Sequence, residues 1–292
     1  MVRGALVTGS SSGLGLALSV ALAREGYATV ATMRDPARGD ALRAAAAEAG
    51  VELDVRALDV TDTDSVAACT AGAIADHGRL DVLVNNAGAG FVRTTEQATE
   101  ADIRANLDVN LMGVIRCTKA VIGHMRERRS GHVINVTSVG GLVGQPFNEI
   151  YCAAKFAVEG YTEALASYVQ PHFGVRFTAV EPGGISSAFA ASALAHFQAS
   201  GGMIDDEYRP LLERYIGGAE ARRTSAERSG TPIFQTPEEV AAVVLACLAA
   251  DEPPVRVRTS DWAETLCETK TGLDPDGRKL QAKVAREFLG EG

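Results

Sequence analysis

The sequence predicts an α/β protein built on a doubly wound parallel sheet. Short apolar runs alternate with longer segments of helical periodicity along most of the 292 residues. The first apolar run, 4–8, leads into a glycine-rich turn that opens a helix. Hydrophobic residues make up 46% of the chain and aromatic residues are few, which is ordinary for a soluble α/β protein. Because strand–helix–strand units cross over right-handed, we expect parallel strands with helices on both sides.

The elements follow in a regular order. Strands are expected at 4–8, 27–33, 51–60, 80–88, 132–138 and 174–184. Helices are expected at 14–26, 42–50, 64–78, 99–128, 151–171 and 236–250. The last helix has Thr236 as its N-cap and Pro237 in its first position.

One segment, 186–235, departs from this rhythm. It has no strand signal, but it contains helical pieces such as FAASALAHFQ and YRPLLERYI. An excursion of this length in a compact domain is usually functional or disordered, and the helical pieces indicate a lid with some structure. It leaves from the end of the sixth strand, where ligands bind in such folds. We therefore expect one domain, 1–292, with a substrate lid at 186–235 and a C-terminal extension at 260–292.

Charge and cysteine content exclude several classes of protein. The net charge of −9 argues against a nucleic-acid surface. The five cysteines are widely spaced without a CxxC pair, which indicates reduced thiols and a cytoplasmic protein. No His or Cys spacing fits a metal site, no apolar run reaches membrane-spanning length, and no signal peptide is expected.

The first turn, TGSSSGLG, places Gly9, Gly13 and Gly15 between a strand and a helix. Glycine permits a tight turn and a close backbone approach, and the helix N-terminus attracts a phosphate. The sequence therefore predicts a dinucleotide site. The alternative is a serine-rich loop without a ligand.

The end of the second strand selects the cofactor. An acidic residue there holds the ribose hydroxyl of NAD, whereas arginine suits the 2′-phosphate of NADP. Because the strand ends at Met33 and is followed by Arg34, we favour NADP over NAD. In the alternative, Arg34 is a surface cation and Asp35 holds the hydroxyl.

Tyr151 and Lys155 stand four residues apart, so they share a face of the expected helix. A lysine beside a phenol favours the phenolate, so we expect the tyrosine pKa to be lowered, giving a proton donor near neutral pH. The alternative is an incidental aromatic beside a solvated lysine.

These and other motifs together resemble the short-chain dehydrogenase/reductase family over nearly the whole chain. The carrying motifs, in family order, are TGSSSGLG, Asp59, NNAG at 85–88, Asn110, Ser138, the YxxxK of 151–155 and PGG at 182–184. Ser138 lies 13 residues before the tyrosine, as the family requires. The stretches ATMRD, SVGGLVGQPFNEIYCAAKFAVEG and LDPDG resemble estradiol 17β-dehydrogenase and its retinol-dehydrogenase relatives.

The resemblance implies a Rossmann fold with seven parallel strands and a role for each motif. Tyr151 would be the general acid and base, Lys155 would tune it and bind the nicotinamide ribose, Ser138 would orient the substrate oxygen, and Asn110 would hold a water. The implied cofactor-binding residues are Gly9, Ser11, Ser12, Gly13, Leu14, Gly15, Arg34, Asp59, Val60, Asn86, Ala87, Gly88, Tyr151, Lys155, Pro182, Gly183, Ile185 and Ser187. The implied substrate residues are Ser138, Val139, Gln145, Tyr151 and Phe189.

Some of these residues have simpler interpretations. Ser138 can cap the turn after its strand, Asn110 can bond to neighbouring backbone, and Asn86 is partly structural in this family. The family usually has threonine after its PG turn, where this chain has Ser186 and Ser187.

We therefore expect an NADP(H)-dependent oxidoreductase that interconverts a ketone or aldehyde with an alcohol. The apolar lid suggests a steroid-, retinoid- or polyketide-like substrate. One alternative is a non-catalytic NADP(H)-binding sensor or scaffold. Another is epimerisation or dehydration, although those relatives usually have a different glycine spacing. The helices at 99–128 and 151–171 are expected to form a homodimer.

Overall fold

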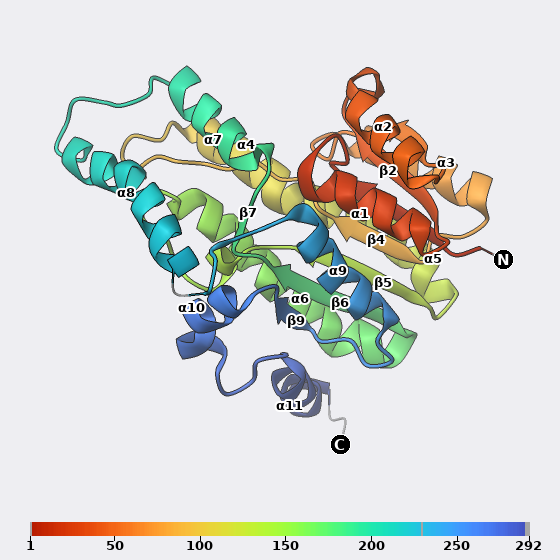
Figure 1. Ribbon diagram of the computed structural model, residues 1–292. Coiled ribbons are helices and arrows are strands. Elements are labelled where there is room, and N and C mark those ends of the chain that lie inside the picture. The colour runs from red at the N-terminus through yellow and green to blue at the C-terminus, as the bar shows by residue number, and fades with distance from the viewer. Residues whose placement is uncertain (1, 229, 290–292) are drawn as a thin grey trace.

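The computed structural model describes residues 2–228 and 230–289. Seven parallel strands form one sheet in the order β3-β2-β1-β4-β5-β6-β9, which confirms the predicted fold class (Figure 1). The strands are β1 (Gly4–Thr8), β2 (Ala28–Met33), β3 (Asp54–Ala57), β4 (Val82–Asn85), β5 (Gly131–Val136), β6 (Val175–Glu181) and β9 (Arg256–Arg258). The order reverses between β1 and β4, so a crevice at their carboxyl ends is the expected ligand site.

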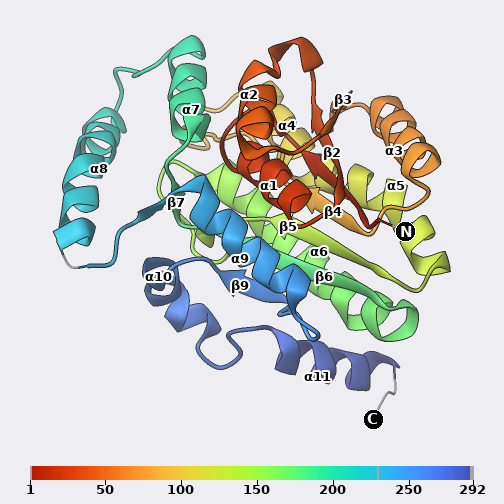
Figure 2. The same ribbon diagram turned by 45° about the vertical axis from the view of Figure 1, so that its right-hand side comes forward.

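Helices cover both faces of the sheet (Figures 1 and 2). One face carries α1 (Gly13–Arg24), α2 (Asp40–Ala49) and α9 (Pro237–Ala249). The other carries α3 (Thr63–His77), α5 (Gly113–Glu127) and α6 (Glu149–Phe173). Strand residues alternate between the two cores, because successive side chains point to opposite faces. Val133 packs with α5 and α6, whereas its neighbour Ile134 packs with α1 and α9.

The predicted helix at 99–128 is continuous but contains an irregular turn. A capping box between Thr99 and Asp102 starts α4 (Glu100–Leu107). A π-helical turn, Asp108–Met112, then joins α4 to α5. Such turns inside α-helices frequently occur at functional sites, and this one contains Asn110.

Three strands differ from the sequence prediction: one is shorter than expected and two were not assigned a range. The strand expected at 51–60 shortens to β3, because it is an edge strand whose only register is with Val30–Met33 of β2. The segment 186–235 does contain a short strand, β8 (Phe234–Gln235), which pairs with β7 (Gly184–Ile185). The sequence prediction gave no range for β9, since a strand of two arginines around one valine has no apolar pattern.

The remaining helices lie at the lid and the C-terminus. Between β7 and β8 the chain forms α7 (Ala188–Ala199) and α8 (Arg209–Arg228), which project beyond the carboxyl ends of the strands (Figure 2). After β9 follow α10 (Asp261–Thr271) and α11 (Arg278–Leu289), which packs on α6. Within the described residues, no helix combines the length and the apolar content that a membrane crossing needs.

Candidate active site

The glycine turn fits tightly between β1 and β4. Gly9 has a φ of 73°, and a Cβ there would lie 2.9 Å from the Cα of Ala87. A Cβ on Gly15 would collide with the Gly9 carbonyl and with the Asn86 amide. Only glycine therefore allows α1 to begin this close to the strand ends. Ser11 and Ser12 are exposed at that helix start, and the N-cap Ser12 makes no side-chain capping bond.

The NNAG segment holds the glycine turn in place. The side-chain amide of Asn86 donates to the carbonyls of Thr8 and Gly9, at 2.9 and 3.2 Å. The Thr8 hydroxyl accepts the backbone N–H groups of Asn86 and Ala87, both at 3.0 Å. Asn86 thus has the structural role that the sequence left open, and it acts on the predicted cofactor turn itself.

Two acidic residues near the end of β2 are already engaged. Asp35 accepts the N–H of Ala37 at 3.0 Å and so caps the short 3₁₀ turn Pro36–Arg38. Asp59 accepts the N–H and the hydroxyl of Thr61, at 2.9 and 2.8 Å. Arg34 is exposed beside them. Partial burial raises the pKa of Asp59, but the Thr61 bonds and the charges of Arg34 and Arg116 outweigh it, leaving the pKa low.

Asn110 is fully buried in the π turn and holds the chain after β4. Its amide nitrogen donates to the carbonyls of Ala89 and Asn106, at 2.8 and 3.1 Å, and its oxygen accepts the N–H of Ala89 at 3.1 Å. A Cβ on Gly88 would lie 3.0 Å from the Asn110 oxygen and 3.8 Å from the Lys155 nitrogen. Gly88 therefore sits between two of the four predicted catalytic side chains, which we call the tetrad: Asn110, Ser138, Tyr151 and Lys155.

Ser138 and Tyr151 meet at the end of β5. Ser138 caps the 3₁₀ turn Val139–Gly141 by accepting the N–H of Gly140 at 3.0 Å. Its hydroxyl also hydrogen-bonds to the phenol of Tyr151. Burial raises the pKa of Tyr151 to about 12, although the Ser138 hydrogen bond acts in the opposite direction.

Lys155 is 4% exposed and donates from Nζ to the Val136 carbonyl at 2.9 Å. Its Nζ lies 5.7 Å from the Tyr151 ring centroid. Burial lowers the pKa of Lys155 to about 8, and the Glu159 carboxyl opposes that effect. The pKa of Tyr151 is raised and not lowered as expected, because burial disfavours the phenolate more than its surroundings stabilise it.

The turn after β6 brings its residues to the same crevice. The N–H of Val139 donates to the Pro182 carbonyl at 2.9 Å, and a Cβ on Gly183 would lie 3.0 Å from the Trp262 ring. Ser187 caps α7, and a Cβ on Gly13 would be 3.1 Å from its Cβ. Ile185 lies in β7 between them. The glycine turn and the start of the lid therefore face each other.

The predicted substrate residues divide into two groups. The Phe189 ring, at the start of α7, lies 6.0 Å from the Tyr151 ring, and Gln145 is half-buried. Val139 does not fit the expectation for a side-chain contact: it is 2% exposed and packs with Leu142 and Ala263. Leu14 and Val60 likewise pack into the core, so these three residues offer only backbone to a ligand.

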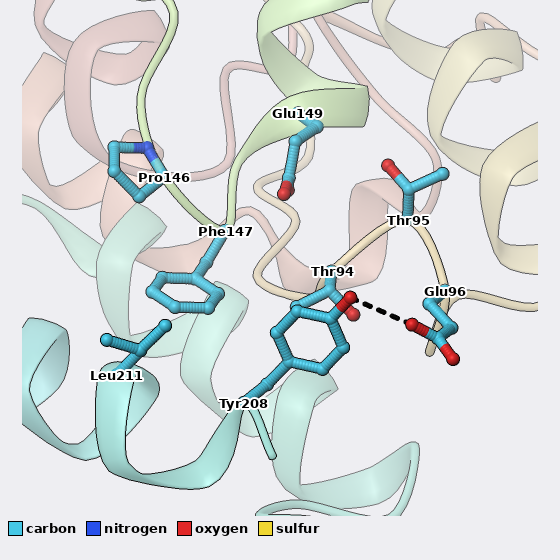
Figure 3. A pocket seen from close by; sticks show the side chains of 8 residues that line it. All are labelled: Thr94, Thr95, Glu96, Pro146, Phe147, Glu149, Tyr208 and Leu211. Carbon is cyan, nitrogen blue, oxygen red and sulfur yellow. Dashed lines mark hydrogen bonds between the residues drawn. The ribbon is translucent and has the colours of Figure 1, made fainter. Parts of the chain in front are cut away.

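A groove of about 490 Å³ lies beside the lid (Figure 3). Phe147 and Leu211 lie side by side in its lining, and the Tyr208 hydroxyl donates to Glu96 at 2.8 Å. Ser138, Tyr151 and Lys155 do not line it. The groove is therefore separate from the predicted tetrad.

Sequence reasoning missed the residue that fixes the lid. Arg93, 3% exposed, donates to the carbonyls of Phe197, Ser200 and Gly202 at 3.2, 2.9 and 3.0 Å. Its guanidinium also stacks on the Phe197 ring, 4.9 Å from the centroid. Phe197 therefore helps to hold the end of α7 in place. Arg93 follows NNAG by only five residues, but no motif marks it.

A buried polar chain behind the strand ends was also missed. Asn85 donates to Thr118 and to Asn135, at 3.1 and 2.8 Å, and Asn135 donates to Thr162 at 2.9 Å. All four side chains are buried, so the chain ties β4 and β5 to α5 and α6. The NNAG motif did contain a signal for this chain, because its first residue is Asn85. Unlike Asn86, which bonds to the glycine turn, the Asn85 side chain is buried.

Known proteins share this architecture. A family model described as short chain dehydrogenase matches residues 3–197. Retinol dehydrogenase 8 of Bos taurus is 38% identical over 281 residues, covering 94% of this chain and 86% of that protein. Estradiol 17-beta-dehydrogenase 1 of Rattus norvegicus is 38% identical over 298 residues, covering 98% and 81%.

A solved structure agrees with these sequence relatives. Actinorhodin polyketide ketoreductase, crystallised as a variant with NADPH, superposes with a TM-score of 0.72 at 30% identity. The match covers 88% of this chain and 95% of that one. The chain therefore belongs to the short-chain dehydrogenase family. It is an oxidoreductase that acts on a CH–OH group of a small molecule with a nicotinamide dinucleotide.

Proposed function

We propose that the protein is an NADP(H)-dependent carbonyl reductase in which Tyr151 transfers the proton. The observation that carries this is the convergence of Ser138, Tyr151 and Lys155 at one point, beside the glycine turn. Tyr151 and Lys155 are both protonated at neutral pH, which is the state needed to give a proton to a carbonyl oxygen.

The crevice fits a dinucleotide. The glycine turn leaves room that a Cβ at Gly13 would fill, and the 12-residue helix α1 presents its N-terminus there. Gly9, Gly13, Gly15, Ser11, Ser12 and the backbone of Leu14 would hold the pyrophosphate. Asp59 and the backbone of Val60 would contact the adenine, and the Asn86–Gly88 and Pro182–Ser187 segments would hold the nicotinamide end. The bound cofactor supplies or accepts the hydride.

In carbonyl reduction the chain would orient and protonate the substrate. The Ser138 hydroxyl would donate to the carbonyl oxygen, and Tyr151 would pass its phenolic proton to that oxygen as charge develops. The Lys155 ammonium would stabilise the resulting phenolate. Asn110 holds Ala89, the residue after the Gly88 that lies beside Lys155, and would keep the path to solvent in place for reprotonation. In alcohol oxidation the same groups act in reverse.

The cofactor preference rests on Arg34. The Asp35 carboxylate already accepts a capping hydrogen bond in the Pro36–Arg38 turn, whereas the Arg34 side chain is exposed at the strand end. A guanidinium there suits a 2′-phosphate, and a capping aspartate is poorly placed to receive a ribose hydroxyl. This supports NADP over NAD.

An apolar substrate is supported by the lid that begins beside Tyr151. Phe189 is 42% exposed, and its ring faces the phenol. Steroid, retinoid and polyketide-like carbonyls all match this surface, and the names of the relatives agree. We further propose that 1–292 is one domain with 186–235 as its lid. A cytoplasmic location is supported by five buried, free cysteines.

The test is NADPH oxidation, followed by absorbance, with steroid ketones, retinal, medium-chain ketones and aromatic ketones. Turnover on one class, faster with NADPH than with NADH, is expected. Ser138→Ala should lower kcat by about 10²–10³-fold, the usual cost of one donor to the developing oxyanion. Turnover unaffected by Ser138→Ala would contradict the assigned site.

A further inference from the structure

Two buried carboxyl groups lie directly behind the predicted tetrad. Glu159 stands one helical turn after Lys155 on α6 and is 5% exposed. Glu181 ends β6 and is 0% exposed. The two carboxyl groups lie within hydrogen-bonding reach of each other, so a proton on one can bridge to the other. The reaction proposed above uses neither of them.

The carboxyl oxygens lack donors. Both oxygens of Glu159 and Oε1 of Glu181 receive no hydrogen bond from any N–H or hydroxyl of the described residues. The Thr137 side chain lies against Glu159, but its hydroxyl donates to the Val180 carbonyl at 3.0 Å. Buried carboxylate oxygens without donors are costly, whereas a protonated carboxyl provides the missing donor itself.

The surrounding charges also favour one proton on the pair. The charged and titratable side chains around the pair are Lys155 and Glu163 of α6, Arg256 and Arg258 of β9, and Glu264 and Cys267 of α10.

The arginines already have carboxylate partners. Arg258 donates to Glu181 at 3.1 Å and pairs with Glu264 at 3.0 Å, and Arg256 pairs with Glu163 at 2.9 Å. With Glu159 neutral, the positive charges of Lys155, Arg256 and Arg258 are balanced. Their three negative counterparts are Glu163, Glu181 and Glu264. Ionising Glu159 would leave an uncompensated buried charge. Burial and the Glu181 charge accordingly raise the pKa of Glu159 well above its usual range.

The pair joins the segments that carry the tetrad. The Cγ of Glu159 would be 3.0 Å from a Cβ on Gly141, in the turn that follows Ser138. Glu181 precedes Pro182, whose carbonyl accepts the N–H of Val139 at 2.9 Å. The helix of Tyr151 is thereby tied to the ends of both β5 and β6.

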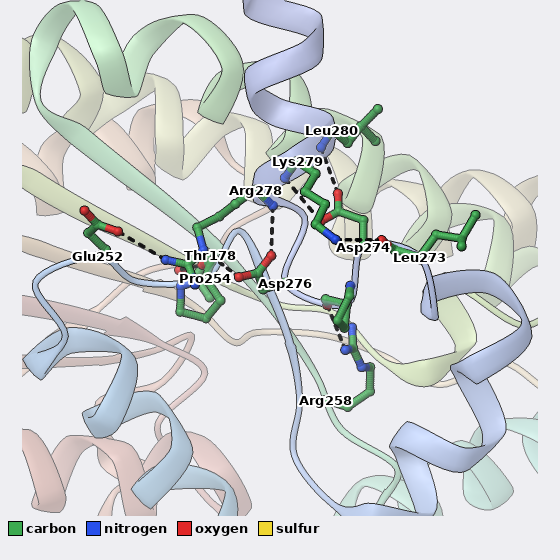
Figure 4. Close-up of polar contacts among 11 residues, drawn as sticks. Thr178, Glu252, Pro254, Arg258, Leu273, Asp274, Asp276, Arg278, Lys279 and Leu280 are labelled. Carbon is green, nitrogen blue, oxygen red and sulfur yellow. Dashed lines mark hydrogen bonds and ion pairs between the residues drawn. The ribbon is translucent and has the colours of Figure 1, made fainter.

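The C-terminal segment secures the pair from behind. Arg258 donates to the Pro275 carbonyl at 2.7 Å (Figure 4). Asp274 accepts the N–H groups of Lys279 and Leu280 at the start of α11, at 3.2 and 2.8 Å. Arg258 is therefore fixed on one side by Glu181 and on the other by the turn that precedes α11.

We propose that Glu159 and Glu181 share one proton and that Glu159 is a positioning residue for the tetrad. The singly protonated pair locks α6 against the strand ends. When it loses the proton, an anion at Glu159 lies one helical turn from Lys155 and favours its ammonium form. The pair thus extends the pH range in which Lys155 stays charged.

Infrared difference spectroscopy tests the shared proton without any substrate. Glu159→Gln keeps the side-chain size and an N–H donor toward Glu181, but it cannot ionise. The wild type should show the carbonyl-stretch band of a buried carboxylic acid at neutral pH, and Glu159→Gln should lack it. Glu149→Gln, an exposed change on the same helix, should keep the band. A band that persists in Glu159→Gln, or that is absent from the wild type, would overturn the assignment.

A second measurement covers the case in which Glu159→Gln does not fold. Glu181→Gln replaces the carboxylate that shares the proton by an amide, so the acid band of Glu159 should change in frequency or intensity there. A band that is identical in the wild type and in that variant would show that the proton belongs to another group.

The pH dependence of unfolding gives an independent readout. Because the folded pKa of Glu159 is raised, the folded protein binds more protons than the unfolded chain between the two pKa values. The wild type should therefore lose stability relative to Glu159→Gln as pH rises through that window. Denaturant unfolding from acidic to neutral pH measures this, and a constant difference between the two proteins contradicts the shared proton.

A pH profile of activity tests the positioning role and rests on the proposed function, whereas the infrared and unfolding measurements do not. In Glu159→Gln no anion supports Lys155, so the alkaline limb of the pH profile for carbonyl reduction should move to lower pH by about one unit. Glu149→Gln should leave the limb in place. An unmoved limb in Glu159→Gln would overturn the positioning role, even with the proton confirmed.

Discussion

The ionisation of Lys155 sets the first prediction at the scale of single residues. Burial lowers the pKa of this lysine to about 8, so its ammonium is present below that pH and is lost above it. Since the ammonium would stabilise the developing Tyr151 phenolate, kcat for carbonyl reduction should fall as pH rises through about 8. Initial rates at saturating NADPH measure this. A profile that stays flat until the ordinary range of lysine would contradict the assignment.

Arg34 makes a second prediction at this scale. A charge-assisted hydrogen bond is typically worth about 1.5–3 kcal/mol, so Arg34→Ala should weaken NADPH binding by about 10–100-fold. NADH lacks the 2′-phosphate and serves as the internal control, with a Kd that should change little. Fluorescence titration of both cofactors gives the answer. Equal losses for the two cofactors would point to a general disturbance of the turn and not to phosphate recognition.

Single residues also show how far sequence reasoning reaches. Gly9, Gly15 and Asn86 were predicted from their motifs, and their backbone contacts explain why those residue types occur there. The pKa of Tyr151 was predicted in the wrong direction, because a spacing of four residues says nothing about burial. Arg93 was missed because its partners are carbonyls more than 100 residues away, which a local pattern does not register.

At the scale of elements, the lid depends on one buried side chain. Arg93 joins the chain after β4 to the end of α7 through carbonyl contacts and through its stacking on Phe197. Arg93→Ala should weaken lid docking by about 3 kcal/mol, the worth of one or two hydrogen bonds from a charged donor. We expect faster proteolysis within 186–235 and a KM for the carbonyl raised roughly tenfold.

The matched control for the lid is Arg104→Ala. Arg104 is an exposed arginine on α4 whose side chain pairs with Glu100 one turn earlier. Exposed pairs of this kind contribute little, so both the cleavage rate and KM should stay at wild-type values. A lid equally resistant in Arg93→Ala and Arg104→Ala would show that α7 and α8 are held by their apolar contacts alone.

Elements with strong periodicity were predicted well, and short ones were not. The helices α1, α3, α5 and α6 and the buried strands β1, β4, β5 and β6 follow from their apolar patterns. β8 and β9 have two and three residues, and their partners lie far away in the chain. Their pairing depends on where the lid and the C-terminal segment return, so tertiary contacts decide it.

At the scale of the whole molecule, α5 and α6 offer a surface for a second copy. Phe156 and Tyr168 are exposed on α6, Met112 is exposed in the π turn just before α5, and Ala157 of α6 is exposed beside Phe156. We propose a homodimer through this face. Ala157→Arg should shift the mass measured by light scattering from dimer toward monomer, because a buried unpaired charge is costly.

The control for the dimer is an alanine-to-arginine substitution on a different surface of the protein. Ala44 is exposed on α2, on the other side of the sheet, so Ala44→Arg should leave the mass at that of a dimer. A wild type that scatters as a monomer at all concentrations would contradict the dimer. It would leave the chemistry of the crevice unaffected.

The central claim is that Tyr151 is the proton donor of an NADPH-dependent reduction. The most direct measurement compares wild type with Tyr151→Phe, which removes one hydroxyl and keeps the ring, for NADPH binding and for NADPH oxidation by a carbonyl substrate. We predict unchanged NADPH affinity and a kcat lowered by about 10²–10⁴-fold, the usual contribution of a general acid. Turnover at the wild-type rate in Tyr151→Phe would contradict the account.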